Sequence, residues 1–159
     1  MCSRKYQNSG NVSYFKNGIV FAFGISDSVA DDCKRIQGRN VPRTVLIADD
    51  NRLIRDALCN IFEVEHDYEL CAQATNGEEA VALAIEHKPD LIILDFAMPV
   101  MNGLEAARKL KHIVPKARII LFTVHAGLFK SRLKDLPVEL VVEKGDPNLM
   151  QHVREMIPA

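Results

Sequence analysis

Residues 43–159 are predicted to form an α/β fold, in which a doubly wound parallel sheet of five strands lies between two layers of helices. Three observations predict it. Short apolar runs rich in β-branched residues alternate with segments whose apolar residues recur at helical spacing. The alternation occurs five times, at the spacing of right-handed strand–helix–strand units. The runs at 91–94 and 118–122 are apolar on both faces, as central parallel strands are.

The first half of this region contains two predicted strands and two predicted helices. The run "TVLIA" (44–48) predicts a strand, and a helix follows with apolar residues at positions 53, 54, 57, 58, 61 and 62. "ELCAQA" (69–74) alternates apolar and polar residues, which predicts a half-exposed edge strand. Asn76 and Glu79 have the spacing of a capping box, so an alanine-rich helix is expected from there to about His87.

The second half adds three strands. Between the central strands "LIIL" and "RIILF", Asn102 and Glu105 predict a second capping box that starts a helix. A short helix is expected near 128–134, followed by the strand "VELVVE" (138–143). Asp146 as N-cap and Pro147 at the first helical position predict the last helix, with an apolar face of Leu149, Met150, Val153 and Ile157. The whole order is that of a flavodoxin-like sandwich with strand order 2-1-3-4-5.

Composition predicts a soluble globular domain with an extension. The 159 residues are 48% hydrophobic and 26% charged, and the net charge of −1 gives no global sign of a nucleic-acid or lipid partner. Residues 1–42 lack periodicity, and their apolar island "GIVFAFGI" is shorter than the roughly 20 residues of a membrane span. We expect a loosely structured or disordered extension, a mis-assigned start or a partly docked strand there, and a cytoplasmic protein.

Cysteine and histidine spacing excludes the common metal and disulfide frameworks. The four cysteines are far apart and form no CxxC pair, and the five histidines form no HxH or HExxH pattern. Idle thiols in a reducing compartment are the better interpretation.

Polar side chains follow the carboxyl ends of four predicted strands. Asp49 and Asp50 follow the first strand, Asp95 the third and Lys144 the fifth, while Thr123 ends the fourth. Ligands of open α/β sheets bind outside these ends, so we expect one site. Three adjacent carboxylates repel one another, and Mg²⁺ relieves this repulsion. One ionised carboxylate can then attack phosphorus, with Lys144 offsetting charge on the phosphoryl oxygens.

With these residues the chain resembles the receiver domain of two-component response regulators, the CheY-like superfamily. The resemblance covers about Thr44 to Ile157. It is carried by four motifs in the order and spacing of that family: "LIADDN", "DLIILDFAMPVMNG", "ILFTVHA" and "VVEKG".

The resemblance implies a role for each site residue. Asp95 would accept a phosphoryl group from the phosphohistidine of a sensor histidine kinase. Asp50, Asp95 and the backbone carbonyl of Ala97 would bind Mg²⁺ directly, and Asp49 would bind it through water. The phosphoryl oxygens would contact Thr123 and Lys144. Met98, Pro99 and Gly103 match the family's loop after the phosphoacceptor.

The resemblance also implies a switch rather than an enzyme, with self-phosphotransfer and autodephosphorylation as its only reactions. An unknown downstream protein would read the face formed by strands four and five and the last two helices. No output domain is recognised after Ala159, and residues 1–42 are too poorly patterned for a DNA-binding module. We therefore expect no direct contact with DNA or membrane, and a homodimer is left open.

Three departures from the family pattern concern the read-out region. Gly145 stands where the family usually has a proline in a cis peptide, and without proline a cis bond is disfavoured. Val141 replaces the common switch aromatic, and Val124 is bulkier than the usual small residue. In relatives, the positions of Ala97 and His125 flank the attacking water, and we expect them to set the lifetime of the phosphoryl group.

Three other functions use similar residues on a related fold. A phosphatase or phosphotransferase of the haloacid dehalogenase type needs a second aspartate where this chain has Ala97. A flavin or nucleotide binder needs a glycine- or hydroxyl-rich loop after the first strand, where "ADDNRLIR" would repel phosphate. A pseudo-receiver, which binds a protein partner without phosphorylation, fits the departures at Val141 and Gly145.

Overall fold

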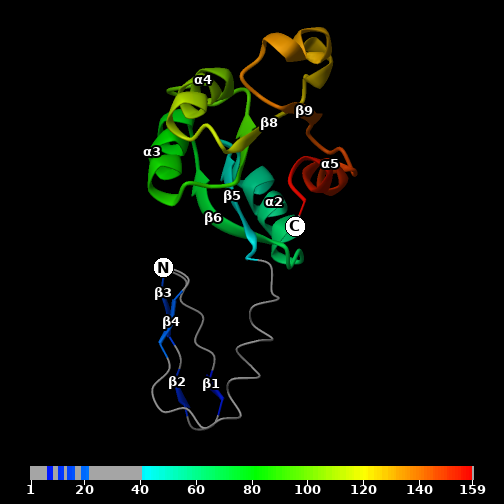
Figure 1. Cartoon of the computed structure of the whole chain (residues 1–159). Coiled ribbons are helices and arrows are strands. Elements are labelled where there is room, and N and C mark those ends of the chain that lie inside the picture. Colours follow the sequence, from blue (N-terminus) through cyan, green and yellow to red (C-terminus); the bar gives the residue numbers. More distant parts are fainter. Residues whose placement is uncertain (1–6, 9–10, 13, 17–18, 22–40, 159) are drawn as a thin grey trace. The chain divides into compact units, whose positions relative to one another are not determined.

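The computed structural model describes residues 7–8, 11–12, 14–16, 19–21 and 41–158 (Figure 1). The chain divides into two compact units, residues 1–39 and 40–159. In the first unit, β1 (Gln7–Asn8) pairs with β2 (Asn11–Val12), and β3 (Tyr14–Lys16) pairs with β4 (Ile19–Phe21), both antiparallel. The loose structure predicted for residues 1–42 falls mostly outside the described residues. Within the described part of the chain, no helix is long and apolar enough to cross a membrane.

The second unit is built on one parallel sheet of five strands, and the predicted fold is confirmed. The strands are β5 (Arg43–Ala48), β6 (Tyr68–Ala74), β7 (Leu91–Asp95), β8 (Arg118–Thr123) and β9 (Leu140–Glu143), in the spatial order β6-β5-β7-β8-β9. Every residue of the central strand β7 is buried, as its continuous apolar run predicts.

Helices cover both faces of this sheet (Figure 1). Helices α2 (Arg52–Glu63) and α5 (Leu149–Met156) pack on one face, and α3 (Gly77–His87) and α4 (Gly103–Ile113) pack on the other. The second interface is lined by small residues, because α3 and α4 bury alanines against the strands: Ala80, Ala84, Ala106 and Ala107. Each fully buried leucine or isoleucine of the strands contributes roughly 1.5–3 kcal/mol relative to exposure.

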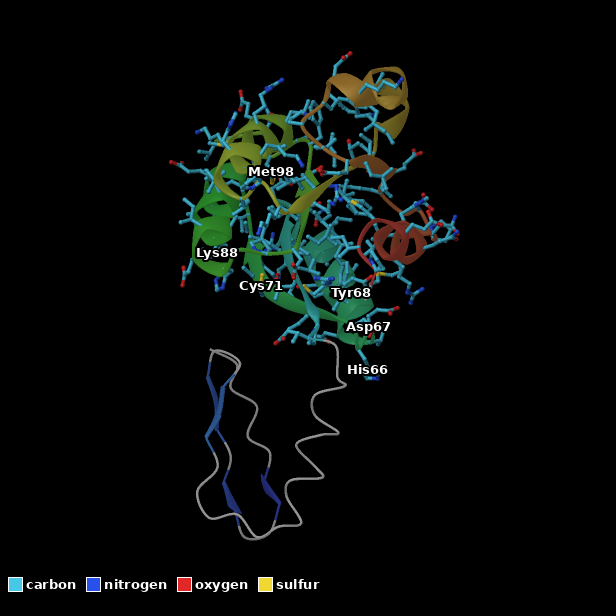
Figure 2. The ribbon with its side chains drawn as sticks, in the orientation of Figure 1. His66, Asp67, Tyr68, Cys71, Lys88 and Met98 are labelled. Atoms are coloured by element: carbon cyan, nitrogen blue, oxygen red, sulfur yellow. The ribbon has the colours of Figure 1, made fainter. Side chains whose placement is uncertain are left out.

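The sheet register places the predicted site residues at one edge. Ala48 pairs with Leu94, so the residues that follow, Asp49 and Asp95, are neighbours. Thr123 pairs with Glu143, the residue before Lys144. Figure 2 shows Met98, which lies in the loop after β7, far from Tyr68 at the start of β6.

The helix predicted near 128–134 is present, but it is of the 3₁₀ type and is divided in two. The segment forms two 3₁₀-helices, η1 (Ala126–Leu128) and η2 (Lys130–Asp135). Neither has a side-chain cap at its start, and Pro137 follows shortly after the second. A 3₁₀-helix advances about 2.0 Å per residue against about 1.5 Å for an α-helix, so it spans more distance with few residues.

Two predicted helix starts also differ. The last helix begins at Leu149 with Asn148 as its cap, because Asp146 Oδ1 instead accepts from the Asn148 backbone N–H at 2.8 Å and forms a turn before the helix. At α3, Asn76 accepts from the Glu79 N–H as predicted. The Glu79 carboxylate, however, accepts from the N–H and hydroxyl of Thr75, so only half of that capping box forms. The capping box at Asn102 and Glu105 is complete.

Gly103 lets the start of α4 pack directly on the end of β7. A Cβ atom at this position would lie 2.1 Å from the carbonyl oxygen of Asp95, a distance that no side chain tolerates. The Gly103 N–H donates to the Phe96 carbonyl at 3.0 Å and closes the loop 96–103. Gly103 therefore sets the backbone position of Asp95.

We predict that Gly103→Ala destabilises the domain by about 1–3 kcal/mol, the usual cost of overpacking a rigid site. Gly127→Ala is the matched control, since a Cβ there meets no atom within 4 Å, and its effect should stay within about 0.5 kcal/mol. Urea unfolding of the two variants checks this. Equal urea midpoints for Gly103→Ala and Gly127→Ala would contradict the close approach of Gly103 to the Asp95 carbonyl oxygen.

Candidate functional site

Three carboxylates meet at the carboxyl ends of β5 and β7. One oxygen from each of Asp49, Asp50 and Asp95 lies within 4.8 Å of the others. Asp49 and Asp95 are buried, with 1% and 5% of their surface exposed, whereas Asp50 is exposed. Two of these charges are therefore removed from water, which makes their mutual repulsion costly.

Lys144 supplies the balancing charge. Its Nζ atom lies 2.6 Å from Asp49 Oδ2 and 3.0 Å from Asp95 Oδ1. Burial acts to lower the pKa of Lys144, but the close contacts with the Asp49 and Asp95 carboxylates together outweigh burial and raise the pKa above the usual lysine value. The ammonium is therefore fully charged at neutral pH and bridges the two buried carboxylates.

Asp49 is the most confined member of the cluster. Burial raises its pKa, against the opposing effects of Lys144 and of the Asn51 N–H, which donates to Oδ1 at 2.9 Å. Among the described residues, no donor has good hydrogen-bond geometry toward its buried Oδ2 atom, so the close Lys144 contact is an ion pair that leaves lone pairs free.

Thr123 and Ala97 lie where the sequence predicts them, at the same edge. Thr123 is buried at the end of β8, and its carbonyl accepts from the Lys144 N–H at 3.0 Å, which ties the lysine to β8. The Thr123 hydroxyl oxygen accepts from the His125 N–H at 3.2 Å. Ala97 is exposed in the loop after Asp95.

Two residues of the site have no counterpart in the sequence prediction. Arg55 Nη1 donates to the carbonyls of Asp49 at 2.8 Å and Asp50 at 3.3 Å, which holds the acidic loop against α2. The Asn51 side chain caps α2 by accepting from the Leu53 N–H. Asn51 directly before the apolar periodicity is a usable cap signal. Nothing in the sequence separates Arg55 from other charged residues on the exposed side of that helix.

The acidic cluster fits a hard divalent cation. Mg²⁺ prefers carboxylate, carbonyl and water oxygens. Three carboxylates within 4.8 Å and one buried oxygen without a directed donor are such a ligand set, while sulfur and imidazole ligands are not part of this cluster. Asp49, Asp50 and Asp95 are the residues that would hold the ion.

No peptide bond among the described residues is cis, in agreement with the expectation from Gly145. Gly145 has φ of +94°, a backbone conformation that favours glycine. Val141 is partly buried and packs against the core cluster on the α3–α4 face.

A flavodoxin-like sheet with an acidic cluster and a bridging lysine at its carboxyl edge defines a class of α/β signalling domains. The chain belongs to the response regulator receiver domain family, whose family model matches residues 45–153. The predicted resemblance is thereby confirmed, and the chain carries the receiver domain of a two-component response regulator.

Curated relatives are named as regulators. Transcriptional regulatory protein PdtaR of Mycobacterium tuberculosis is 45% identical over 85 residues, which are 52% of this chain and 41% of that protein. Nitrate/nitrite response regulator protein NarL of Escherichia coli is 39% identical over 83 residues, 52% of this chain and 38% of that protein. The matches thus span less than half of each relative's length.

Solved receiver structures share the architecture. The response regulator TrrA of Thermotoga maritima, in complex with Mg²⁺ and BeF, is 32% identical with a TM-score of 0.65 and covers 72% of this chain and 99% of its own. CheY of Borrelia burgdorferi, in a complex with CheX, BeF3 and Mg, is 27% identical with a TM-score of 0.67, covering 73% of this chain and 90% of its own.

We predict that Lys144→Met destabilises the domain by about 3–5 kcal/mol at neutral pH without divalent cations, because it leaves two buried carboxylates without a counter-charge. Arg52→Met is the control, since its ion pair with Asp56 is exposed and worth about 0.3–0.5 kcal/mol. Urea unfolding of both variants makes the comparison. If Lys144→Met lowers the free energy of unfolding by no more than Arg52→Met does, the contacts of Lys144 with Asp49 and Asp95 do not stabilise the fold.

Proposed function

We propose that this chain is a phosphorylation-controlled switch in which Asp95 accepts a phosphoryl group from a sensor histidine kinase. Asp50, Asp95 and the Ala97 carbonyl would bind Mg²⁺ directly, with Asp49 binding through water. Thr123 and Lys144 would contact the phosphoryl oxygens. One observation carries the proposal: the Lys144 ammonium, on a side chain that is 14% exposed, lies 3.0 Å from Asp95 Oδ1 and 2.6 Å from Asp49 Oδ2, beside the exposed Asp50.

The transfer conserves atoms and charge. A bond forms between an Asp95 carboxylate oxygen and phosphorus while the phosphorus–nitrogen bond to the kinase histidine breaks, and that nitrogen keeps the electron pair. Bound Mg²⁺ would supply positive charge that keeps the carboxylates ionised near the incoming phosphate. Lys144 would stabilise charge on a phosphoryl oxygen, and the Thr123 hydroxyl would donate to another.

The added group changes the balance between two arrangements of the surrounding loops. Each charge-assisted hydrogen bond gained is worth about 1.5–3 kcal/mol, enough to shift a two-state equilibrium about 10–100-fold. The loop after β8 and the surface of β9 and α5 would move, and a protein partner would bind that surface. The domain would catalyse only its own phosphorylation and dephosphorylation, and direct DNA contact by residues 43–159 is not part of the proposal.

A second function is favoured by the read-out region. Val141 has no ring, and two 3₁₀-helices stand where one helix was expected. These features support a pseudo-receiver that binds a protein partner regardless of phosphorylation. The two proposals differ in whether the chain gains phosphate.

We predict a gain of one phosphoryl mass on the intact chain after incubation with Mg²⁺ and a small-molecule phosphodonor, and no gain with chelator. Asp95→Asn should fold normally and gain nothing, because the amide is not a nucleophile at this position. Mass spectrometry measures both.

Asp50→Asn and Asp56→Asn form a matched pair for the metal. Both side chains are exposed, but only Asp50 belongs to the acidic cluster, so only Asp50→Asn should slow uptake. Unchanged uptake by Asp95→Asn would refute the acceptor assignment. No uptake by the unmodified chain would favour the pseudo-receiver, and rapid repeated turnover of the donor would favour an enzyme.

A further inference from the structure

A ring contact joins the loop after Asp95 to the two 3₁₀-helices. Phe96 directly follows Asp95, and Phe129 lies between η1 and η2. The ring centroids are 5.0 Å apart and the ring planes meet at 62°, the edge-to-face arrangement that aromatic pairs favour. Both rings are partly buried against the core cluster on the α3–α4 face of the sheet.

The segment 126–135, here called the 3₁₀ segment, is otherwise weakly held. Its two short helices have no side-chain caps. A Cβ at Gly127 would meet no atom within 4 Å, and Leu128 is 71% exposed. Ala126, its first residue, is buried, and the other described apolar contacts of the segment with the core come from Phe129 and Leu133. Because short 3₁₀-helices have poor hydrogen-bond geometry, these contacts largely determine where the segment lies.

The other partner, Phe96, is fixed at its backbone. Its carbonyl accepts from the Gly103 N–H at 3.0 Å, and Gly103 packs against the Asp95 carbonyl without room for a Cβ. Because the Phe96 backbone is held in this way, a shift of Asp95 would also shift Phe96. The Phe96 ring would then displace the Phe129 ring that it contacts.

We propose that Phe129 is a positioning residue that couples the 3₁₀ segment to the state of Asp95 through its contact with Phe96. This inference rests on the proposed function and adds the route by which the site reaches a surface. Coupling is reciprocal, so the contact also sets how tightly Asp95 holds a phosphoryl-like group. The exposed Leu128 lies within the coupled segment and the exposed Val124 lies just before it, and both would move with the segment.

The test measures amide hydrogen exchange of residues 126–135 in the full chain, with and without Mg²⁺ and beryllium fluoride. In the unmodified chain, the exchange rates of this segment should change on addition of the probe. In Phe129→Leu, which keeps an apolar side chain but removes the ring, that change should fall about fivefold or more, the lower range of typical coupling. The affinity for beryllium fluoride should fall by a similar factor.

Three variants separate coupling from general damage. Phe129→Tyr keeps the ring and should retain the exchange response. Leu128→Ala, at the exposed neighbouring residue, should also retain it. Phe96→Leu should lose it as Phe129→Leu does, and thermal melting shows that each variant is folded.

The outcomes distinguish the two proposals. One outcome is that the unmodified chain binds the probe and Phe129→Leu shows the same change in hydrogen exchange as the unmodified chain. In that case the coupling role is wrong and the proposed function stands. Loss of the response in Leu128→Ala or in Phe129→Tyr also overturns the role of the ring. If the unmodified chain neither binds the probe nor gains phosphate, the proposed function fails and this inference fails with it.

Discussion

The balance of charge around one partly buried ammonium governs this domain. Lys144 lies between Asp49 and Asp95, two carboxylates that are almost fully buried, while the exposed Asp50 adds a third negative charge at the rim. One cation cannot neutralise three carboxylates, so the site keeps an excess of negative charge that favours a divalent metal. The same lysine is the nearest described positive charge for any anionic group on Asp95. Under the proposed function, Lys144 would exchange one of its carboxylate contacts for a contact with a phosphoryl oxygen.

The backbone makes this arrangement precise. The parallel register places the ends of β5 and β7 side by side, and the hydrogen bond from the Lys144 N–H to the Thr123 carbonyl fixes β9 relative to β8. Gly103 brings α4 against the Asp95 carbonyl, and Arg55 holds the acidic loop from the other side. The firmly held region around Asp95 contrasts with the 3₁₀ segment, which has fewer contacts. Rigid placement of reacting groups beside a loosely held surface is what a switch requires, since only the second part has to move.

Much of this was predictable from the sequence, for identifiable reasons. The strands follow from their apolar runs, and the central ones from burial on both faces. The shared position of the site residues follows because parallel strands end at one edge of the sheet. The predicted helix caps differ from the structure where one side chain has two possible hydrogen-bond partners. Asp146 caps a turn instead of the helix, and Glu79 bonds Thr75 instead of Asn76. The division of residues 126–135 into two 3₁₀-helices is not predictable, because the spacing of apolar residues does not reveal the distance that a connection must span. The Phe96–Phe129 contact joins residues far apart in the sequence, and no sequence pattern predicts it.

The account is tested most directly by a crystal structure of the chain with Mg²⁺ and beryllium fluoride. We expect the beryllium atom on an oxygen of the Asp95 carboxylate, with the Lys144 ammonium and the Thr123 hydroxyl in contact with fluorine atoms. We expect Mg²⁺ to be bound by Asp50, Asp95 and the Ala97 carbonyl. Density for the ion and fluoride away from Asp95, with Lys144 still bridging Asp49 and Asp95, would contradict the central claim that this ammonium serves an acceptor site.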